Sequence, residues 1–486
     1  MKDRIHQQHN KKILWLLLPL LIVLYLAVGA VAPFISYKKM PEDAELHPEL
    51  EAMIDRENKE TVDRVMLLET NESAWEERLR FLNQARERII LSTFDMREGE
   101  STRDLFSLIL EKADEGVNVK IVVDGFPGVV RMLGRPLFES IAAHPNIEIR
   151  HYNPINLLMP WKSQGRMHDK YVIVDDLGYI LGGRNTFDYF IGNYDTKNKS
   201  FDREVLVYNS AHGTDAGKES SLKQVETYFD TIWNLDVMKP FAENHRLASG
   251  KKIREIRGEL EGRLRNIKEA HSDLFEIANY IPVTYETEGI CLLSNPTGIY
   301  GKQPEVFYQL MKLVEKAGQK TVIHTPYFVC NQYMEDTLKK VNDKIPDLKI
   351  VFNSIANGDN FFASSDYMRQ KKHLVNLGIP MYEYDGGNST HGKSLVIGSE
   401  IAVIGSYNMD LRSTYLDTEL MLVIKSTKLT EELQQNMQKI EKDCRKVITS
   451  TEYEIKPDIN VKKISPFRMI AMKIVGFVMQ PVRFLI

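Results

Sequence analysis

The sequence has few cysteines, no excess of charge of either sign and little overall hydrophobicity. Three cysteines in 486 residues, at Cys291, Cys330 and Cys444, are too few and too far apart for a disulfide framework or a zinc knuckle. A net charge of −4 argues against the broad basic surface of a nucleic-acid binder. The mean hydropathy of −0.30 excludes a polytopic membrane protein. At this length we expect about three domains or one large duplicated unit.

One long apolar run lies near the start, at residues 13–36. Its first 23 residues carry no charge, and a helix of that length crosses the ~30 Å core of a bilayer. The leader 1–12 has more basic residues than the two that follow the run, Lys38 and Lys39. The positive-inside rule therefore predicts a single-pass anchor in the cell membrane, with the body outside the cytoplasm. The alternative is a secretory signal peptide cleaved after residue 32, although Pro33 follows that site.

The last segment, residues 456–486, is both basic and apolar. From Ile459 to Ile486 it has no acidic residue and five basic ones: Lys462, Lys463, Arg468, Lys473 and Arg483. Such an amphipathic tail predicts contact with anionic lipid headgroups. The alternative is a C-terminal helix docked on the neighbouring domain.

The body of the chain contains one series of predicted strands and helices twice. Thr93 and Thr325 are 232 residues apart at matched strand ends, and so are Tyr152 and Tyr384. We therefore predict an α/β fold of two duplicated lobes with mixed, largely parallel sheets flanked by helices, around one pseudo-twofold site. The predicted parts after the anchor are a linker (37–61), lobe 1 (62–245), a helical connector (246–285), lobe 2 (286–455) and the basic tail (456–486).

Each lobe carries a His-x-Lys motif followed, after a predicted hairpin, by Gly-(Gly/Ser)-x-Asn. A histidine and a lysine two positions apart on a strand face the same side. The return strand of the hairpin brings the asparagine back beside the histidine, 17 residues later in both lobes. We expect the two sets to share one pocket. They are His168, Lys170 and Asn185 in lobe 1, and His391, Lys393 and Asn408 in lobe 2.

Two imidazoles and two ammonium groups in one pocket suit a phosphate ester. The ammonium groups neutralise charge that builds up on the phosphoryl oxygens. One imidazole can attack phosphorus to form a phosphohistidine, and the other can protonate the leaving alkoxide. We expect Glu204 and Glu419, which open apolar strands after the hairpins, to hold the far nitrogens of the imidazoles. The sequence predicts no metal and no cofactor, because no clustered ligand set is visible.

The paired motifs resemble those of the phospholipase D superfamily. Residues 182–190, 325–328 and 405–413 around them are similar to bacterial cardiolipin synthases. This resemblance implies phosphatidyl transfer through a phosphohistidine without a metal, with His168 as the nucleophile and His391 as the general acid and base. Within the similar segments we expect three further residues to contact the substrate: Arg184, Ser406 and Arg412.

Two positions depart from the family pattern. Gly183 replaces a serine in the first lobe, and Gly398 replaces the motif aspartate in the second. The first lobe keeps this aspartate as Asp175, seven residues after His168, which is about 23 Å along an extended strand. We therefore place Asp175 in the hairpin turn and not in the pocket. Since glycine is a good turn residue, Gly398 should spare the chemistry.

The favoured hypothesis is a membrane-bound phosphatidyltransferase that makes cardiolipin and glycerol from two molecules of phosphatidylglycerol. If water attacked the same intermediate, the protein would be a phospholipase D hydrolase. A nuclease or phosphodiesterase and an inactive envelope scaffold are the weaker alternatives. The expected partners are phospholipids and the membrane, with no nucleic acid, and the oligomeric state is left open.

Overall fold

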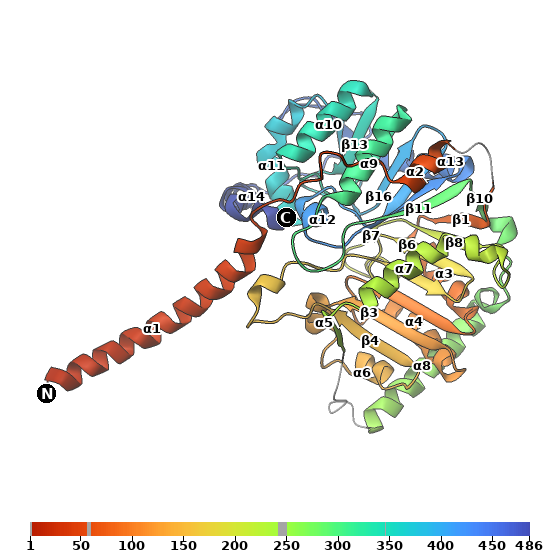
Figure 1. Ribbon diagram of the computed structural model, residues 1–486, viewed down its shortest axis with the longest axis horizontal. Helices are drawn as coiled ribbons and strands as arrows, with labels where there is room; N and C mark the ends of the chain where they lie inside the picture. The colour runs from red at the N-terminus through yellow and green to blue at the C-terminus, as the bar shows by residue number, and fades with distance from the viewer. Residues whose placement is uncertain (1, 56–59, 242–249, 346) are drawn as a thin grey trace.

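The computed structural model describes residues 2–55, 60–241, 250–345 and 347–486, and side chains from residue 17 onward. Two α/β lobes lie against each other, and helix α1 (Lys2–Val31) extends away from them (Figure 1). Among the described residues, α1 with the short η1 (Ala32–Phe34) holds the single candidate membrane span. Its apolar window, Leu17–Phe34, has a mean hydropathy of 2.4 and is 6% buried. The predicted N-terminal apolar helix is therefore present.

Lobe 1 is built on a nine-stranded sheet in the order β10-β1-β8-β6-β5-β2-β3-β4-β9. Only the β2–β3 and β3–β4 neighbours are parallel. The strands are β1 (Asp63–Leu68), β2 (Arg88–Thr93), β3 (Asn118–Asp124), β4 (Ile147–Tyr152), β5 (Tyr171–Val174), β6 (Gly178–Gly182), β8 (Glu204–Asn209), β9 (Met238–Pro240) and β10 (Tyr285–Glu286).

Lobe 2 repeats this sheet, in the order β11-β18-β17-β16-β12-β13-β14-β19-β20. Eight strands correspond one to one with those of lobe 1, so the predicted duplication is confirmed. The strands are β11 (Gly289–Ser294), β12 (Thr321–His324), β13 (Leu348–Asn353), β14 (Met381–Tyr384), β16 (Lys393–Ile397), β17 (Ile401–Gly405), β18 (Leu420–Lys425), β19 (Cys444–Val447) and β20 (Tyr453–Glu454). Short strands β7 (Ser200–Phe201) and β15 (Ser389–Thr390) pair across the lobes.

The expectation of largely parallel sheets is wrong, although mixed sheets are confirmed. Helix-separated strands such as β12, β13 and β14 are parallel, as helical crossovers require. The other neighbours within the two nine-stranded sheets are antiparallel, in part because hairpins such as β5–β6 and β16–β17 reverse the chain within the sheet. The alternation of strands and helices in the sequence therefore predicted more parallel strand pairs than the sheets contain.

The two sheets face each other across a shared apolar core. Strands β8 and β18 are buried on both faces, which explains their unbroken apolar runs. In β18, Leu420, Leu422 and Ile424 enter the shared core, while Met421 and Val423 face the outer core of lobe 2. Helices α7 (Leu222–Trp233) and α13 (Thr427–Glu441) complete the shared core.

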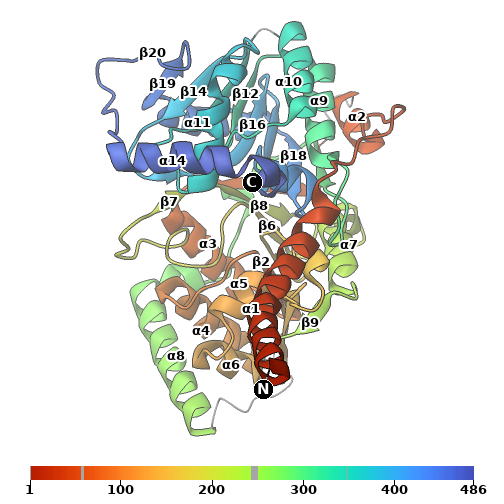
Figure 2. The same cartoon turned by 90° about the vertical axis from the view of Figure 1, so that its left-hand side faces the viewer.

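Further helices cover the outer face of each sheet (Figures 1 and 2). On lobe 1 they include α3 (Asn71–Asn83), α4 (Glu100–Asp114), α6 (Pro136–Ala142) and α8 (Gly250–Ala270). On lobe 2 they include α2 (Pro48–Asp55), α9 (Glu305–Ala317), α10 (Gln332–Lys344) and α11 (Phe361–Val375).

The predicted connector contains α8, which packs on lobe 1 through Ile256, Leu260 and Leu264. The expected boundary between residues 245 and 246 falls in 242–249, outside the described residues. After α8 the chain returns to lobe 1, where β10 pairs with β1.

The basic tail forms helix α14 (Pro466–Val478) and the turn η6 (Gln480–Leu485) on lobe 2. Gly476 lets α14 approach α11 closely, because a Cβ there would lie 2.6 Å from the Ser365 carbonyl oxygen. Arg483 forms an ion pair with Asp366 at 2.7 Å, and Phe484 is buried. The tail is thus docked on the domain, yet α14 keeps an exposed apolar face.

The β5–β6 turn contains Asp175, as expected, in the left-handed conformation with φ of 46°. Its carboxylate accepts hydrogen bonds from the backbone N–H groups of Arg86, Glu87 and Arg88 at 2.7, 3.0 and 2.7 Å. In lobe 2, Gly398 has φ of 60°, and the Gln319 amide fills the space where a side chain at 398 would begin. The motif aspartate is therefore a turn residue in lobe 1, and a glutamine takes its space in lobe 2.

We expect Asp175→Ala to lower the free energy of unfolding by about 1–2 kcal/mol, because three N–H groups lose their acceptor and alanine disfavours positive φ. Urea unfolding followed by circular dichroism measures the change. The neighbouring Asp176, which accepts one backbone hydrogen bond from Gly213, is the matched control, and Asp176→Ala should cost less. Equal costs for the two variants would contradict this role of Asp175.

Candidate active site

The two His-x-Lys segments lie where the lobes meet, one just before β5 and the other at the start of β16. His168 donates its backbone N–H to Thr418 of lobe 2 at 3.3 Å, and His391 donates to Phe201 of lobe 1 at 2.6 Å. Both imidazoles are buried. The prediction that the two motifs share one site agrees with this geometry.

Each imidazole is held by a carboxylate of the other lobe. His168 Nδ1 lies 2.8 Å from Glu419 Oε1, and His391 Nδ1 lies 2.6 Å from Asp202 Oδ2. Both carboxylates are fully buried. A carboxylate on Nδ1 fixes the ring orientation and turns Nε2 toward the reaction. At His391, Lys393 Nζ also contacts Nδ1 and lies 3.3 Å from Nε2. Neither lobe contains a complete site by itself.

Glu204 does not hold an imidazole, which corrects the expectation. It forms an ion pair with Arg78 at 2.6 Å, and Arg184 lies 3.6 Å away. The sheet register explains the error. Gly182 lies opposite Glu204 in lobe 1, and Gly405 lies opposite Met421 in lobe 2. Met421 and Glu204 are therefore matched positions, and the residues two positions before them are Glu419 and Asp202. Asp202 is thus the counterpart of Glu419, whereas the sequence prediction had chosen Glu204.

The register also accounts for Gly183, the counterpart of Ser406. Ser406 donates a hydrogen bond to Glu419 Oε2, so it positions the carboxylate, and its expected contact with the substrate stays a prediction. Ser413 donates to Oε1 of the same carboxylate at 2.5 Å. In lobe 1, a Cβ at position 183 would lie 2.4 Å from Asp202 Oδ1. Glycine at 183 therefore makes room for the Asp202 carboxylate.

The two expected substrate-binding arginines are engaged elsewhere. Arg184 is fully buried and donates to backbone carbonyl oxygens, among them Phe190 at 3.1 Å and Leu68 at 2.9 Å. Arg412 forms an ion pair with Asp417 at 2.9 Å and donates to the Gln164 carbonyl oxygen at 2.7 Å, which links the lobes. Both arginines hold backbone segments around the site.

The two lysines are buried beside the histidines. Lys170 donates to the carbonyl oxygen of His168, and Lys393 donates to that of His391 at 2.6 Å. Lys393 Nζ also lies 3.3 Å from Asp202 Oδ2. Burial lowers the pKa of Lys170 to about 7 and also lowers the pKa of Lys393. The pocket therefore holds two amines that burial makes less basic, and a phosphate group beside them would favour their charged form.

The carboxylates give the two histidines different electrostatic surroundings. Burial alone would raise the pKa of Asp202, but Lys393 and His391 hold it below its usual value. Burial raises the pKa of Glu419 despite the nearby Lys170. Burial and the two lysines lower the pKa of His168 far below its ordinary value, and burial with Lys393 also lowers the pKa of His391. His168 is thus held neutral, while His391 faces a firmly ionised partner.

A cavity of about 760 Å³ opens at the site. Asn185 and His391 both line it, and Asn185 Oδ1 accepts a hydrogen bond from the Asp95 N–H at 3.2 Å. The Oδ1 atom of Asn408 is buried without a hydrogen-bond partner within the described part of the chain. Aromatic rings that sequence reasoning missed form much of the wall: Phe94, Phe187, Tyr189, Phe190, Tyr327, Phe361 and Phe362.

The aromatic rings reach both histidines. Phe94 packs edge-on against His168 and Phe190 tilts against His391, each with ring centroids 5.2 Å apart. Phe94 directly follows Thr93, one of the matched strand ends, and this position is the feature of the sequence that could have indicated its place beside the site. The rings limit the motion of the imidazoles and line an entrance suited to an amphipathic substrate.

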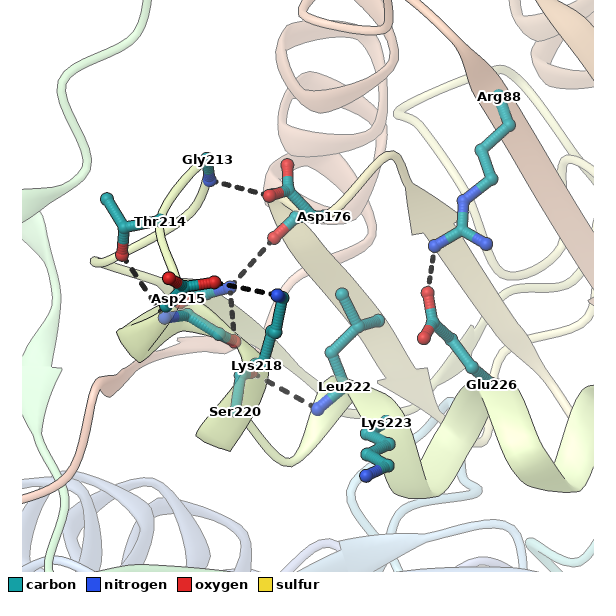
Figure 3. A pocket seen from close by; sticks show the side chains of 12 residues that line it. Arg88, Asp176, Gly213, Thr214, Asp215, Lys218, Ser220, Leu222, Lys223 and Glu226 are labelled. Carbon is teal, nitrogen blue, oxygen red and sulfur yellow. Dashed lines mark hydrogen bonds and ion pairs between the residues drawn. The ribbon is translucent and has the colours of Figure 1, made fainter.

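A second cavity, of about 840 Å³, lies at the other end of the β5–β6 hairpin (Figure 3). Asp176 accepts a hydrogen bond from Gly213 there, and Arg88 pairs with Glu226. Its lining contains neither histidine, so it lies apart from the catalytic chemistry.

Among the described residues, one group of side chains could hold a metal ion. His47, Glu49 and Cys291 place their ligand atoms within 4.8 Å of one another, a set not evident from the sequence. The group joins the start of α2 to β11 and includes no residue of the histidine site.

The sequence matches the family model described as "Cardiolipin synthase, PLD-like domain" at residues 79–233 and 310–441. These segments make up more than half of the chain and include both His-x-Lys motifs. The chain belongs to this family. The resemblance noted from the motifs is confirmed, and with it a phospholipase D-type enzyme family.

Cardiolipin synthase C of Escherichia coli (strain K12) is 25% identical over 407 residues, which cover 75% of this chain and 82% of the relative. The major cardiolipin synthase ClsA of Bacillus subtilis (strain 168) is 23% identical, covering 72% of this chain and 63% of the relative. The phosphatidylserine synthase of Haemophilus influenzae Rd KW20 has a similar fold. Its TM-score is 0.60 at 15% identity, covering 87% of this chain and 95% of that one.

We expect Gly183→Ser to reduce turnover of a phosphodiester substrate by on the order of 10²-fold, because the new Cβ displaces Asp202 from His391. Ser406→Gly is the matched control. It removes one of three groups that hydrogen-bond Glu419 and should cost less. Steady-state kinetics with both variants, at equal unfolding midpoints, measures the difference. Wild-type turnover in Gly183→Ser would show that the position tolerates a side chain.

Proposed function

We propose that the protein is a membrane-bound phosphatidyltransferase that converts two molecules of phosphatidylglycerol into cardiolipin and glycerol. The observation that carries this proposal is the pair of buried imidazoles, each held by a carboxylate of the other lobe, beside two buried lysines. Family membership supports a phospholipid substrate. The apolar helix α1 supports a membrane anchor, and the excess of basic residues before it supports a body outside the cytoplasm.

His168 is the nucleophile in this proposal. Its neutral imidazole attacks the phosphorus of the first lipid through Nε2, forming an N–P bond as the P–O bond to the glycerol headgroup breaks. His391 gives its proton to the leaving glycerol oxygen. The Asp202 carboxylate favours the imidazolium that this step needs, and so opposes burial and Lys393, which lower the pKa of His391. Lys170 and Lys393 neutralise the phosphoryl oxygens.

The second half-reaction reverses these roles. Neutral His391 takes a proton from a hydroxyl of the second phosphatidylglycerol, whose oxygen attacks phosphorus and displaces His168. Cardiolipin leaves and both imidazoles return to their starting protonation states. If water attacked instead, the product would be phosphatidic acid.

Product analysis tests the reaction. We expect the full-length protein, reconstituted with phosphatidylglycerol, to yield cardiolipin and glycerol in equal amounts, measured by lipid mass spectrometry and a glycerol assay. Phosphatidic acid as the main product would identify a hydrolase. No turnover by well-folded protein would favour the scaffold hypothesis.

Trapping the intermediate tests which histidine is the nucleophile. We expect His391→Ala to accumulate a phosphatidyl adduct on His168, because nucleophilic attack needs only a neutral imidazole there. His168→Ala should form none. Peptide mass spectrometry at neutral pH locates the adduct, and an adduct on His391 would reverse the assignment.

The pH dependence tests the two carboxylates separately. The rate rises with pH as His168 loses its proton and falls as His391 loses its own. Removing an anion destabilises the neighbouring imidazolium and lowers its pKa. We therefore expect Asp202→Asn to move the alkaline limb of kcat/KM to lower pH. Glu419→Gln should move the acid limb to lower pH by a smaller amount, because burial raises the pKa of Glu419 and weakens its negative charge. The opposite pattern would exchange the roles of the two histidines.

A further inference from the structure

Three separate segments lie on the side of the molecule from which α1 leaves (Figures 1 and 2). They are residues 125–138, which include α5 (Gly125–Arg131), residues 154–164, which include η2 (Pro160–Lys162), and residues 459–486, which include α14. We call these segments together the docking face.

The docking face exposes large apolar side chains on each of its three segments. Leu158 is 79% exposed, Phe467 is 83% exposed and Val130 is 54% exposed. On α14 the exposed residues recur every three or four positions and therefore form one helix face. A cluster of this kind on a soluble surface is unusual and marks an interaction site. Its members include Phe126, Val130, Leu133, Leu157, Leu158, Phe467, Ile470, Ile474 and Phe477.

The charges of the docking face have one sign. None of its three segments contains an acidic residue, whereas each contains basic ones. The partner should therefore be both apolar and anionic, which describes a bilayer that contains acidic lipids. Leaving out Arg483, which pairs with Asp366, the basic residues are Arg131, Arg135, Lys162, Lys462, Lys463, Arg468 and Lys473.

Direct contacts join the docking face to the candidate membrane span. The Tyr25 hydroxyl of α1 donates a hydrogen bond to the Leu158 carbonyl oxygen at 2.8 Å. At Gly29, a Cβ would lie only 2.5 Å from the Pro160 ring, so the two segments touch. Tyr25 lies within the apolar window, nine residues before its end at Phe34, which is about 13 Å along a helix. If the apolar window Leu17–Phe34 crosses the bilayer, Leu158, which contacts Tyr25, lies at the level of the bilayer.

We infer that the docking face is seated in the headgroup layer of an anionic bilayer, with residues 155–161 inserted beside α1. This goes beyond the proposed reaction, since it concerns where the body binds. It also bears on substrate entry, which rests on the proposed function. Helix α14 lies along α11, and α11 begins with Phe361 and Phe362 at the cavity mouth. A lipid phosphate could then reach the histidines without leaving the membrane surface.

Site-directed fluorescence on the full-length protein tests this inference. The three native cysteines are buried, so introduced surface thiols can be labelled selectively. Leu158→Cys, Val130→Cys and Phe467→Cys each place a fluorophore on one segment. Ile277→Cys is the matched control: Ile277 is apolar and 86% exposed, but lies beside Gln84 and Val117 at the amino ends of β2 and β3, whereas α5 follows the carboxyl end of β3.

Each labelled protein is reconstituted in phosphatidylglycerol–phosphatidylcholine vesicles with or without nitroxide-bearing lipid. We expect nitroxide lipid to quench all three test positions but not Ile277→Cys, and iodide in the water to quench only the control. The inference would be overturned if iodide quenched the three test positions as strongly as it quenches Ile277→Cys. Shielding from iodide without nitroxide quenching would also overturn it, in favour of a protein partner or second copy. Neither readout depends on turnover, so a failure of the proposed reaction remains distinguishable.

Discussion

The exchange of carboxylates between the lobes is the constraint on which the rest of the structure depends. Glu419 of lobe 2 holds His168 of lobe 1, and Asp202 of lobe 1 holds His391 of lobe 2. All four groups are buried, and a buried carboxylate that lost its partner would cost several kcal/mol. The lobes must therefore stay in one fixed relation for either histidine to be oriented.

The shared core between the sheets supplies that fixed relation. Glu419 directly precedes β18, and Asp202 lies two positions before β8, so the strands that build the core also carry the carboxylates. Alternate residues of β8 and β18 point into the shared core and into the outer cores. A shift between the sheets would move both carboxylates away from both imidazoles. Packing and catalytic geometry are thus coupled through the same two strands.

The duplicated halves differ where the proposed chemistry needs them to differ. Ser406 supports the longer Glu419 side chain, whereas Gly183 makes room for the shorter Asp202. Asp202 is held ionised by Lys393, but burial raises the pKa of Glu419. A transfer in two steps needs one neutral nucleophile and one protonated acid, and two identical half-sites would not favour such a division. At the far turns, by contrast, Asp175 and the Gln319–Gly398 pair are alternative ways to occupy the same space.

The sequence by itself determined the duplication, the hairpins and the two His-x-Lys pairs, because strand periodicity and turn residues are local signals. It also placed Asp175 in a turn, since seven extended residues separate it from His168. Only the tertiary structure decided which carboxylate meets which imidazole. The partners are 251 residues apart for His168 and 189 for His391, and a register set by sheet pairing selects Asp202 over Glu204. The motif positions of Arg184 and Arg412 were also visible in the sequence, but folding alone brings Arg184 to the Leu68 carbonyl oxygen and Arg412 to the Gln164 carbonyl oxygen. Local patterns specify strands and turns, whereas contacts between lobes depend on how two sheets pack, which no short stretch of sequence encodes.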